Sequence, residues 1–228
     1  MSENSTALTE AKTQIQKQNN VPIETITLDL SNEDSANSLI DSTSEYSRQI
    51  EVLINNAGVF FFGHAVDVEP ARTQQLINLH IQTSTQLCIH FGKLMKERGR
   101  GYILNTSSIS AYKNYPGIAL YASSKAYLRS FTRSLRLELK PFGVHVTCLL
   151  PGATETNLYR TTQVNLSLAK RLGIMRSPTQ VAHAGLRGLW RNKAEVVPGL
   201  MTKLVAAIMR YTPYWVIYQI RKRTNILD

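Results

Sequence analysis

The chain has 228 residues, of which 43% are apolar and 18% charged, and this composition excludes disordered, collagen-like and disulfide-scaffold classes. The formal net charge is +10, and residues 170–228 hold 11 Lys and Arg against 2 Asp and Glu. Cys88 and Cys148 lie in apolar stretches without metal-ligand spacing, so we expect a reducing compartment and no metal site. Residues 1–20 are polar, so we expect no signal peptide and a cytoplasmic location. The length suits one α/β domain over 1–228.

The hydrophobic pattern predicts short strands that alternate with longer helices. In chain order, the expected elements are a helix at 6–18, a strand at 21–30, a helix at 31–48 with Ser31 as N-cap, a strand at 51–54, a long helix at 70–98, a strand at 101–106, a helix at 121–139, a strand at 144–150, a helix at 178–190 and a short strand at 195–197. This alternation indicates a parallel sheet with helices on both faces, a Rossmann-like doubly wound α/β fold. Such sheets bind ligands beyond the carboxyl ends of their strands.

Tyr121 and Lys125 stand four residues apart in the helix predicted at 121–139, so they share one face of it. A lysine ammonium beside a phenol favours the phenolate and brings the tyrosine pKa towards the range useful for proton transfer. The spacing alone is weakly specific, because Tyr218 and Lys222 repeat it. Only the first pair is preceded, at a distance of thirteen residues, by Ser108 at the end of a predicted strand.

Two other strand ends carry motifs, Asn55-Asn56-Ala57-Gly58 and Pro151-Gly152. With Ser108, Tyr121 and Lys125, they make the chain resemble the short-chain dehydrogenase/reductase family over roughly 21–198. The resemblance implies an oxidoreductase that interconverts a carbonyl and a secondary alcohol by hydride transfer with NAD or NADP, NADP being slightly favoured. It also implies a small-molecule substrate and a homodimer or homotetramer, with no nucleic-acid partner.

The resemblance further assigns roles to individual residues. It makes Tyr121 the general acid/base, Lys125 its electrostatic partner and a ligand of the nicotinamide ribose, and Ser108 a hydrogen-bond partner of the substrate oxygen. Asn78 would anchor a water that links Lys125 to solvent. The remaining cofactor contacts would be Asp29 at the adenine, Asn55, Ala57 and Gly58 at the adenosine, and Pro151, Gly152 and Thr156 at the nicotinamide and its phosphate.

Two of these assignments have ordinary alternatives. Asp29 is equally suited to cap the helix that follows it, and Asn78 to be a polar residue of the long helix. None of the five histidines has a spacing that indicates catalysis or metal binding.

The resemblance fails at the start of the chain. The family opens with a strand, a glycine-rich turn and a helix that binds the pyrophosphate, whereas this sequence has no glycine before Gly58. Residues 5–30 instead resemble the third helix and third strand of the family, so we expect an N-terminally truncated chain that lacks an opening unit of roughly 30 residues. The strand at 21–30 then has no neighbour, and the strand at 51–54 becomes an exposed edge. The alternative to an enzyme is a non-catalytic relative that dimerises through the helices at 70–98 and 121–139.

Residues 200–223 are apolar, aromatic and basic, and Arg210 and Pro213 interrupt the apolar run, so we do not expect a transmembrane helix. Two interpretations of this basic C-terminal extension (200–228) remain open. It lies on an anionic membrane or covers a lipophilic substrate site, as in family reductases that act on lipophilic carbonyls. Otherwise it is a helix packed on the domain with a basic face towards solvent.

Overall fold

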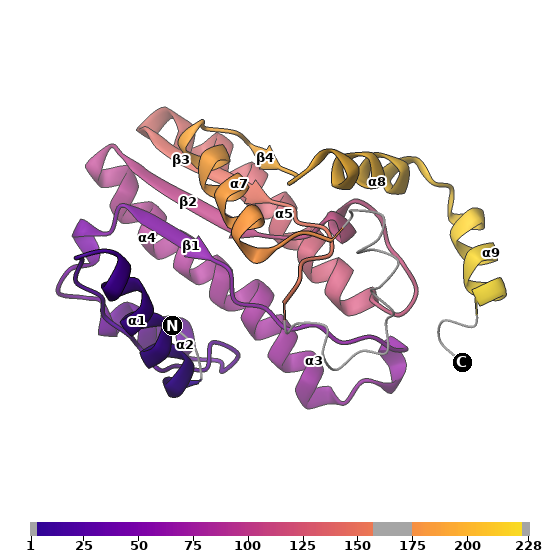
Figure 1. Ribbon diagram of the computed structural model, residues 1–228, viewed down its shortest axis with the longest axis horizontal. Helices are drawn as coiled ribbons and strands as arrows, with labels where there is room; N and C mark the ends of the chain where they lie inside the picture. Colours follow the sequence, from indigo (N-terminus) through magenta and orange to yellow (C-terminus); the bar gives the residue numbers. More distant parts are fainter. Residues whose placement is uncertain (1–3, 157–174, 225–228) are drawn as a thin grey trace.

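The computed structural model describes residues 4–156 and 175–224. Its sheet is parallel and has the order β1-β2-β3-β4 (Figure 1). The strands are β1 (Val52–Asn55), β2 (Gly101–Thr106), β3 (Val144–Leu149) and β4 (Glu195–Val196). All four lie where the sequence predicts them, and they confirm the doubly wound α/β class.

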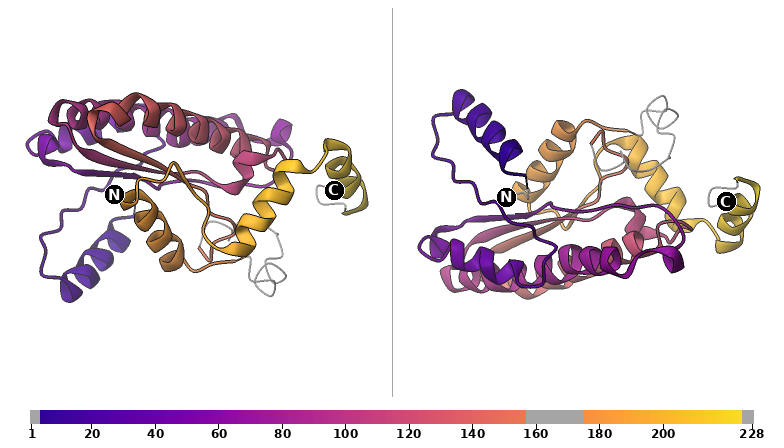
Figure 2. Two further views of the ribbon diagram at one scale, coloured as in Figure 1. Left: turned by 90° about the horizontal axis from the view of Figure 1, so that it is seen from above. Right: turned by 90° about the horizontal axis from the view of Figure 1, so that it is seen from below.

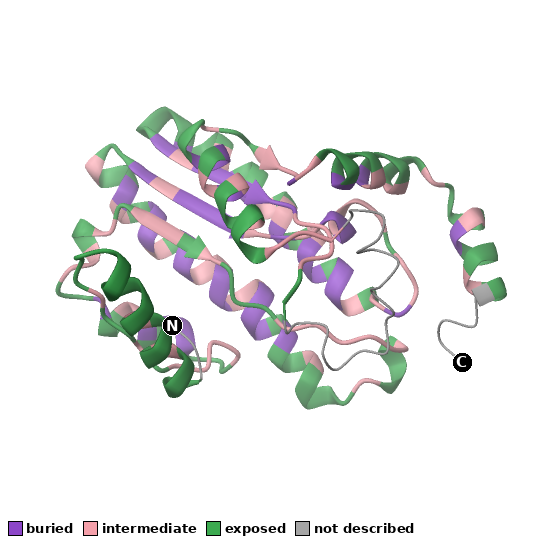
Figure 3. Ribbon diagram, in the orientation of Figure 1, coloured by how far each residue is buried: buried purple, intermediate pink, exposed green. Residues whose placement is uncertain are grey.

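Helices cover both faces of the sheet (Figure 2). On one face, α4 (Ser84–Arg98) and α5 (Ala119–Leu139) pack on the strands around buried Phe91, Met95 and Val146. On the other face, α7 (Pro178–Trp190) packs on Leu104 and Leu149. Strands β2 and β3 are mostly buried (Figure 3), as expected for a parallel sheet covered on both sides.

The long helix predicted at 70–98 is present but has an irregular centre. It comprises α3 (Pro70–Ile77), a π-helical turn η3 (Asn78–Thr83) and α4. Pro70 occupies its first turn, and Gly99 ends it in the left-handed conformation with φ 75°. The π turn has four buried residues, and such turns often accompany functional sites.

The N-terminal segment differs from the prediction. Helix α1 (Ser5–Gln18) forms, but the strand predicted at 21–30 is wrong, since that stretch contains only one bridging residue, Thr27. A strand needs a hydrogen-bonding neighbour along its length, and within the described ranges this segment is bridged at Thr27 alone. The predicted helix at 31–48 shortens to α2 (Ser35–Ser42), with Asp34 at the N-cap position.

The capping prediction for Ser31 fails for a local reason. Its backbone N–H and its hydroxyl both donate to the Asp29 carboxylate, at 2.9 and 2.7 Å, and this makes a turn before the helix begins.

The prediction that the strand at 51–54 lies at the edge of the sheet is confirmed. Strand β1 pairs only with β2 among the described strands, and Ile54 is 48% exposed. The unpaired side of a parallel edge strand leaves backbone donors and acceptors open to solvent or to another chain.

The C-terminal part forms two further helices, α8 (Leu200–Tyr211) and α9 (Tyr214–Thr224). Helix α8 packs on the domain through buried Ala206, which joins Ile109 and Leu150 in one apolar cluster. Within the described ranges, no helix has the length and apolar character needed to span a bilayer. Residues 225–228 of the predicted extension lie outside the described residues.

Candidate active site

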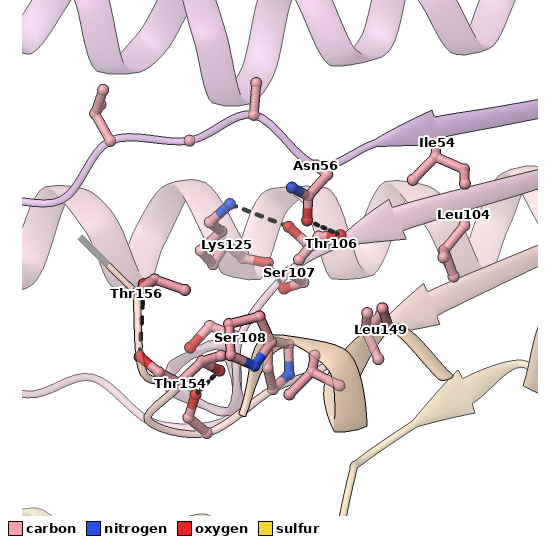
Figure 4. Close-up of a pocket in the computed structure, with 18 of the residues that line it drawn as sticks. Ile54, Asn56, Leu104, Thr106, Ser107, Ser108, Lys125, Leu149, Thr154 and Thr156 are labelled. Atoms are coloured by element: carbon pink, nitrogen blue, oxygen red, sulfur yellow. Dashed lines mark hydrogen bonds between the residues drawn. The ribbon is translucent and has the colours of Figure 1, made fainter. Parts of the chain in front are cut away.

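A cavity of about 650 Å³ lies at the carboxyl ends of the first three strands (Figure 4). Loop residues that follow β1, β2 and β3 form one part of its lining, and α5 contributes Tyr121 and Lys125. The part formed by α7 and the strands is apolar and includes Leu104, Leu149 and Val181. This is the edge at which doubly wound sheets bind ligands, as the sequence predicts.

Lys125 is the buried cation of this cavity, with 4% of its surface exposed. Its Nζ donates to the Thr106 carbonyl oxygen at 3.0 Å and lies 5.7 Å from the centre of the Tyr121 ring. Burial disfavours the ammonium and lowers the pKa of Lys125 from 10.5 to about 8. Near neutral pH the side chain is therefore still largely protonated and places a positive charge close to the phenol.

The Tyr121 ring is packed edge-on against two aromatic rings. The Phe60 ring lies 4.8 Å away and the His80 ring 5.8 Å away, measured between ring centres. These neighbours come from the loop after β1 and from the π turn. Tyr121 is 9% exposed and still lines the cavity, so its position is restricted while the ring remains accessible from the cavity.

Two serines after β2 have different tasks. Ser107 is buried and its Oγ donates to the Lys125 carbonyl oxygen at 2.7 Å, which ties the loop to α5. Ser108 lines the cavity and its Oγ accepts from the Ser110 backbone N–H at 3.2 Å. A hydroxyl can accept and donate at the same time. While Ser108 Oγ accepts this bond, its O–H can still donate to a group in the cavity.

Two glycines bring the backbone close to the cavity. A Cβ at Gly58 would lie 3.1 Å from His80 Nε2 and 3.6 Å from Lys125 Nζ, and one at Gly152 would lie 2.9 Å from Thr202 Cγ2. Side chains at these positions would fill space next to Lys125 and next to the loop after β3.

The structure brings together eight of the eleven residues that the resemblance assigns to the site. These are Ala57, Gly58, Ser108, Tyr121, Lys125, Pro151, Gly152 and Thr156, all of which line the cavity. The other three, Asp29, Asn55 and Asn78, are not among its lining residues.

Each of these three makes contacts elsewhere. Asp29 accepts from Ser31, and Asn78 donates to the Ser31 carbonyl oxygen at 2.8 Å. Asn55 donates to Asn105 Oδ1 at 2.9 Å in the interior of the sheet. In this structure their hydrogen bonds stabilise the turn at Ser31 and link strand β1 to strand β2.

Asn56, the second residue of the motif Asn55-Asn56-Ala57-Gly58, also lines the cavity, and its Oδ1 accepts from the Thr106 hydroxyl at 3.2 Å. The residue beside the site that sequence reasoning missed is His80. His80 lies behind Tyr121, and no spacing signal marks it, because its place depends on the π turn.

The sequence model of the family described as short chain dehydrogenase matches residues 1–166. This chain belongs to the short-chain dehydrogenase/reductase family. Its members are oxidoreductases that use NAD or NADP on a Rossmann-like fold, which agrees with the parallel sheet and with the position of the cavity.

A curated relative agrees with this assignment, and two solved structures agree with the fold. Ketoacyl reductase HetN of Nostoc sp. is 28% identical over 195 residues, which cover 82% of this chain and 67% of HetN. A short-chain dehydrogenase from Sphingobium yanoikuyae, solved with NADPH, superposes with a TM-score of 0.77 at 21% identity, covering 96% of this chain and 83% of that one. A 7beta-hydroxysteroid dehydrogenase superposes with a TM-score of 0.84 at 17% identity, covering 97% and 85%. The chain spans about half to two thirds of the curated relatives it matches.

The cavity fits part of a nicotinamide dinucleotide. Its volume of about 650 Å³ has room for a flat ring and a sugar, and Lys125 supplies a donor for ribose hydroxyls. Dinucleotide pyrophosphates usually sit at a glycine-rich turn and a helix N-terminus. The residues before Gly58 supply no glycine for such a turn.

Replacing Lys125 by methionine should stabilise the fold at pH 7 by about 1–3 kcal/mol. Lowering the pKa of this lysine from 10.5 to about 8 corresponds to roughly 3 kcal/mol of unfavourable charge burial, partly offset by the bond to Thr106. Between these two pKa values Lys125 is more protonated in the unfolded chain than in the folded one, so the contribution of this residue to the free energy of unfolding rises with pH there. Lys125→Met should lack that rise.

Urea unfolding at pH 7 and at pH 9.5 measures both effects, with the exposed Lys140→Met as the matched control. A Lys125→Met protein that is less stable at pH 7 and keeps the wild-type pH slope would contradict the expected cost of burying this cation.

Proposed function

We propose that this chain interconverts a carbonyl and a secondary alcohol with NAD or NADP, using Ser108, Tyr121 and Lys125. The observation that carries the proposal is the buried Lys125 ammonium, 5.7 Å from the Tyr121 ring in a cavity that Ser108 also lines. Proton transfer to a substrate oxygen requires a proton donor, a hydrogen-bond donor that orients the oxygen and a positive charge. The phenol, the hydroxyl and the ammonium around this cavity supply these three groups.

The nicotinamide cofactor, when bound, supplies or accepts the hydride. Ser108 donates a hydrogen bond to the substrate oxygen and orients the carbonyl. Tyr121 gives its phenolic proton to that oxygen during reduction, or takes a proton from the alcohol during oxidation. Lys125 stabilises the resulting phenolate, and its bond to the Thr106 carbonyl oxygen holds the ammonium in place.

The substrate in this proposal is lipophilic. The part of the lining formed by α7 and by strands β2 and β3 is apolar, with Leu104, Leu149, Val181 and Leu186. The likeness to a ketoacyl reductase supports a carbonyl on an apolar chain. We also propose a homodimer or homotetramer through α4 and α5, supported by the exposure of Ile89 (59%) and Leu137 (73%) on these helices.

Tyr121→Phe should lower kcat by on the order of a hundredfold or more, since it removes the proton donor and leaves the ring in place. Tyr218→Phe is the matched control, because Tyr218 has the same spacing to a lysine but is 58% exposed on α9. Steady-state kinetics with a panel of lipophilic ketones and NADPH or NADH measures both. Equal losses at the two positions would be incompatible with the assignment.

The 228-residue chain should bind nicotinamide cofactor weakly. Charge-assisted hydrogen bonds contribute roughly 1.5–3 kcal/mol each, so the lack of two or three phosphate donors should weaken binding by about a hundredfold or more. A chimera that carries the glycine-rich βαβ unit of a relative before this chain should bind the cofactor tightly. Calorimetric titration with NADH and NADPH measures the cofactor Kd of both proteins. Micromolar affinity of the unfused chain would refute the expectation.

A second candidate function is peripheral binding of an anionic membrane through α8 and α9. Their outward side chains include Leu200 (82% exposed), Ile208 (59%), Tyr211 (77%) and Trp215 (70%). Residues 200–224 contain five Lys or Arg and no acidic residue. Exposed apolar and aromatic side chains among basic ones are typical of helices that lie at a bilayer surface.

The packing of α8 favours binding at a membrane surface over a helix that only packs on the domain. Thr202 and Ala206 of this helix are buried and Val205 and Met209 are partly buried, so one side of α8 meets the domain and its other side chains are exposed (Figure 3). A second copy of the chain would bring five like charges against five, whereas anionic lipid complements them. Thr202, on the buried side of α8, lies next to the loop at Gly152, which places this helix beside the cavity.

Removing positive charge from this face should abolish binding to vesicles of anionic phospholipid, because each basic residue near such a surface contributes about 1 kcal/mol. The test variant replaces Lys203, Arg210 and Lys222 by glutamine, and its control replaces the exposed Lys17, Lys93 and Lys140 in the same way. Co-sedimentation at low and high salt measures binding, which salt should weaken in the wild type. Wild-type protein that ignores anionic vesicles at low salt would exclude this function.

A further inference from the structure

His80 is a buried polar residue that the proposed chemistry does not yet use. It belongs to the π turn η3, is 1% exposed and lies behind Tyr121. Both ring nitrogens make hydrogen bonds. Nε2 accepts from the Val59 backbone N–H at 3.0 Å, and Nδ1 lies 2.9 Å from Ser124 Oγ.

These bonds determine the tautomer of the ring. Since Nε2 accepts the Val59 proton, the single proton of a neutral ring must be on Nδ1. Ser124 Oγ donates to the Tyr121 carbonyl oxygen at 2.8 Å, so this hydroxyl is free to accept from His80 Nδ1–H. The result is one directed chain of three hydrogen bonds, from Val59 through His80 and Ser124 to the backbone of Tyr121.

The surroundings also oppose a charged ring. Burial, and next to it the positive charge of Lys125, hold the pKa of His80 well below its usual value of 6.5. The titratable groups shown around the ring are Lys125 and Tyr121, both from α5. A second ring proton on Nε2 would point at the Val59 N–H, so protonation and this hydrogen bond exclude each other.

The chain of bonds connects the two walls of the cavity. Val59 follows Gly58 in the loop after β1, and both residues line the cavity. Tyr121 and Ser124 belong to α5, and Tyr121 also lines the cavity. The ring of His80 therefore fixes the distance between the loop that would hold the cofactor and the helix that carries the phenol.

We propose that His80 is a positioning residue. In its neutral Nδ1–H form it holds the loop at Gly58–Val59 at a fixed distance from Tyr121, as proton transfer requires. The expected effect on kinetics rests on the proposed reductase function. The expected effect on structure rests on the hydrogen bonds alone. His80 touches neither substrate nor cofactor in this role, and it acts through Val59 and Ser124.

The kinetic test compares two replacements of this residue. His80→Leu removes both bonds and should lower kcat/KM about tenfold to a hundredfold, with a raised KM for the cofactor, because the loop and the phenol lose their register. His80→Gln can accept from Val59 with its oxygen and donate to Ser124 with its amide, so it should recover most of that loss. His90→Leu, the same exchange at a half-buried histidine of α4, should leave both constants unchanged.

The structural test does not depend on activity. Nitrogen-15 NMR of labelled histidine in the intact chain should show His80 as the neutral Nδ1–H tautomer at pH 7. Hydrogen exchange at the Val59 amide should be slow in the wild type and faster in His80→Leu. Ser124→Ala, a smaller change suited to the case in which His80→Leu does not fold, should shift the His80 nitrogen signals and lower kcat.

The outcomes separate the two proposals. A charged ring or an Nε2–H tautomer at pH 7 overturns the inference, as does a His80→Leu enzyme with wild-type kinetics or a His80→Gln enzyme as impaired as His80→Leu. A chain with the expected tautomer and Val59 protection that turns over no carbonyl tested, even in the chimera that binds the cofactor, supports the hydrogen-bond role and refutes the reductase function.

Discussion

The burial of the Lys125 ammonium is the constraint around which this site is organised. A lysine with 4% of its surface exposed carries a charge that is costly away from water, and its bond to the Thr106 carbonyl oxygen offsets only part of that cost. Neighbouring residues are arranged to tolerate it. Ser107 ties the Lys125 backbone to the loop after β2, and Gly58 leaves room beside Nζ that a side chain would fill. Burial, and in addition the charge of Lys125, lower the pKa of His80, so the same cation acts on the phenol and on the histidine beside it.

The π turn connects this site with the N-terminal segment. On one side its His80 bonds to Ser124 and Val59, and on the other its Asn78 and Thr83 donate to the carbonyl oxygens of Ser31 and Leu30, at 2.8 and 3.0 Å. The segment before α2 is thus held by side-chain hydrogen bonds where the sheet provides no strand for it. Asp29 contributes by closing the turn at Ser31.

The two ends of the sheet differ in what they leave exposed. Among the described strands, β1 pairs on one side only and has a partly exposed Ile54, while the opposite end, beyond β4, continues into helices whose outer faces are apolar and basic. The cavity lies between them, at the carboxyl ends of the strands. An exposed backbone edge can pair with a further strand, whereas a basic apolar face is suited to an anionic surface. We therefore expect the edge of β1 to bind a strand and the outer faces of α8 and α9 to bind an anionic surface.

The sequence by itself determined the parallel sheet, most of its helices and the core of the site. Short apolar strands, proline and glycine at the helix ends, and polar motifs after strands are local features, and each predicted element of the sheet at 51–54, 101–106, 144–150 and 195–197 forms. Eight of the residues assigned by the motifs meet in one cavity for the same reason, because parallel strands end at one edge.

Tertiary structure alone decided the rest. The apolar alternation at 21–30 is a local strand signal, but a strand needs a neighbour, and neighbours are a property of the whole sheet. Asn55 and Asn56 are alike in sequence, yet one bonds inside the sheet to Asn105 and the other reaches the cavity. His80 carried no pattern at all, since its partners at Val59 and Ser124 come from 21 residues before it and 44 residues after it. Contacts over such distances depend on how the helices pack on the sheet, which local periodicity does not encode.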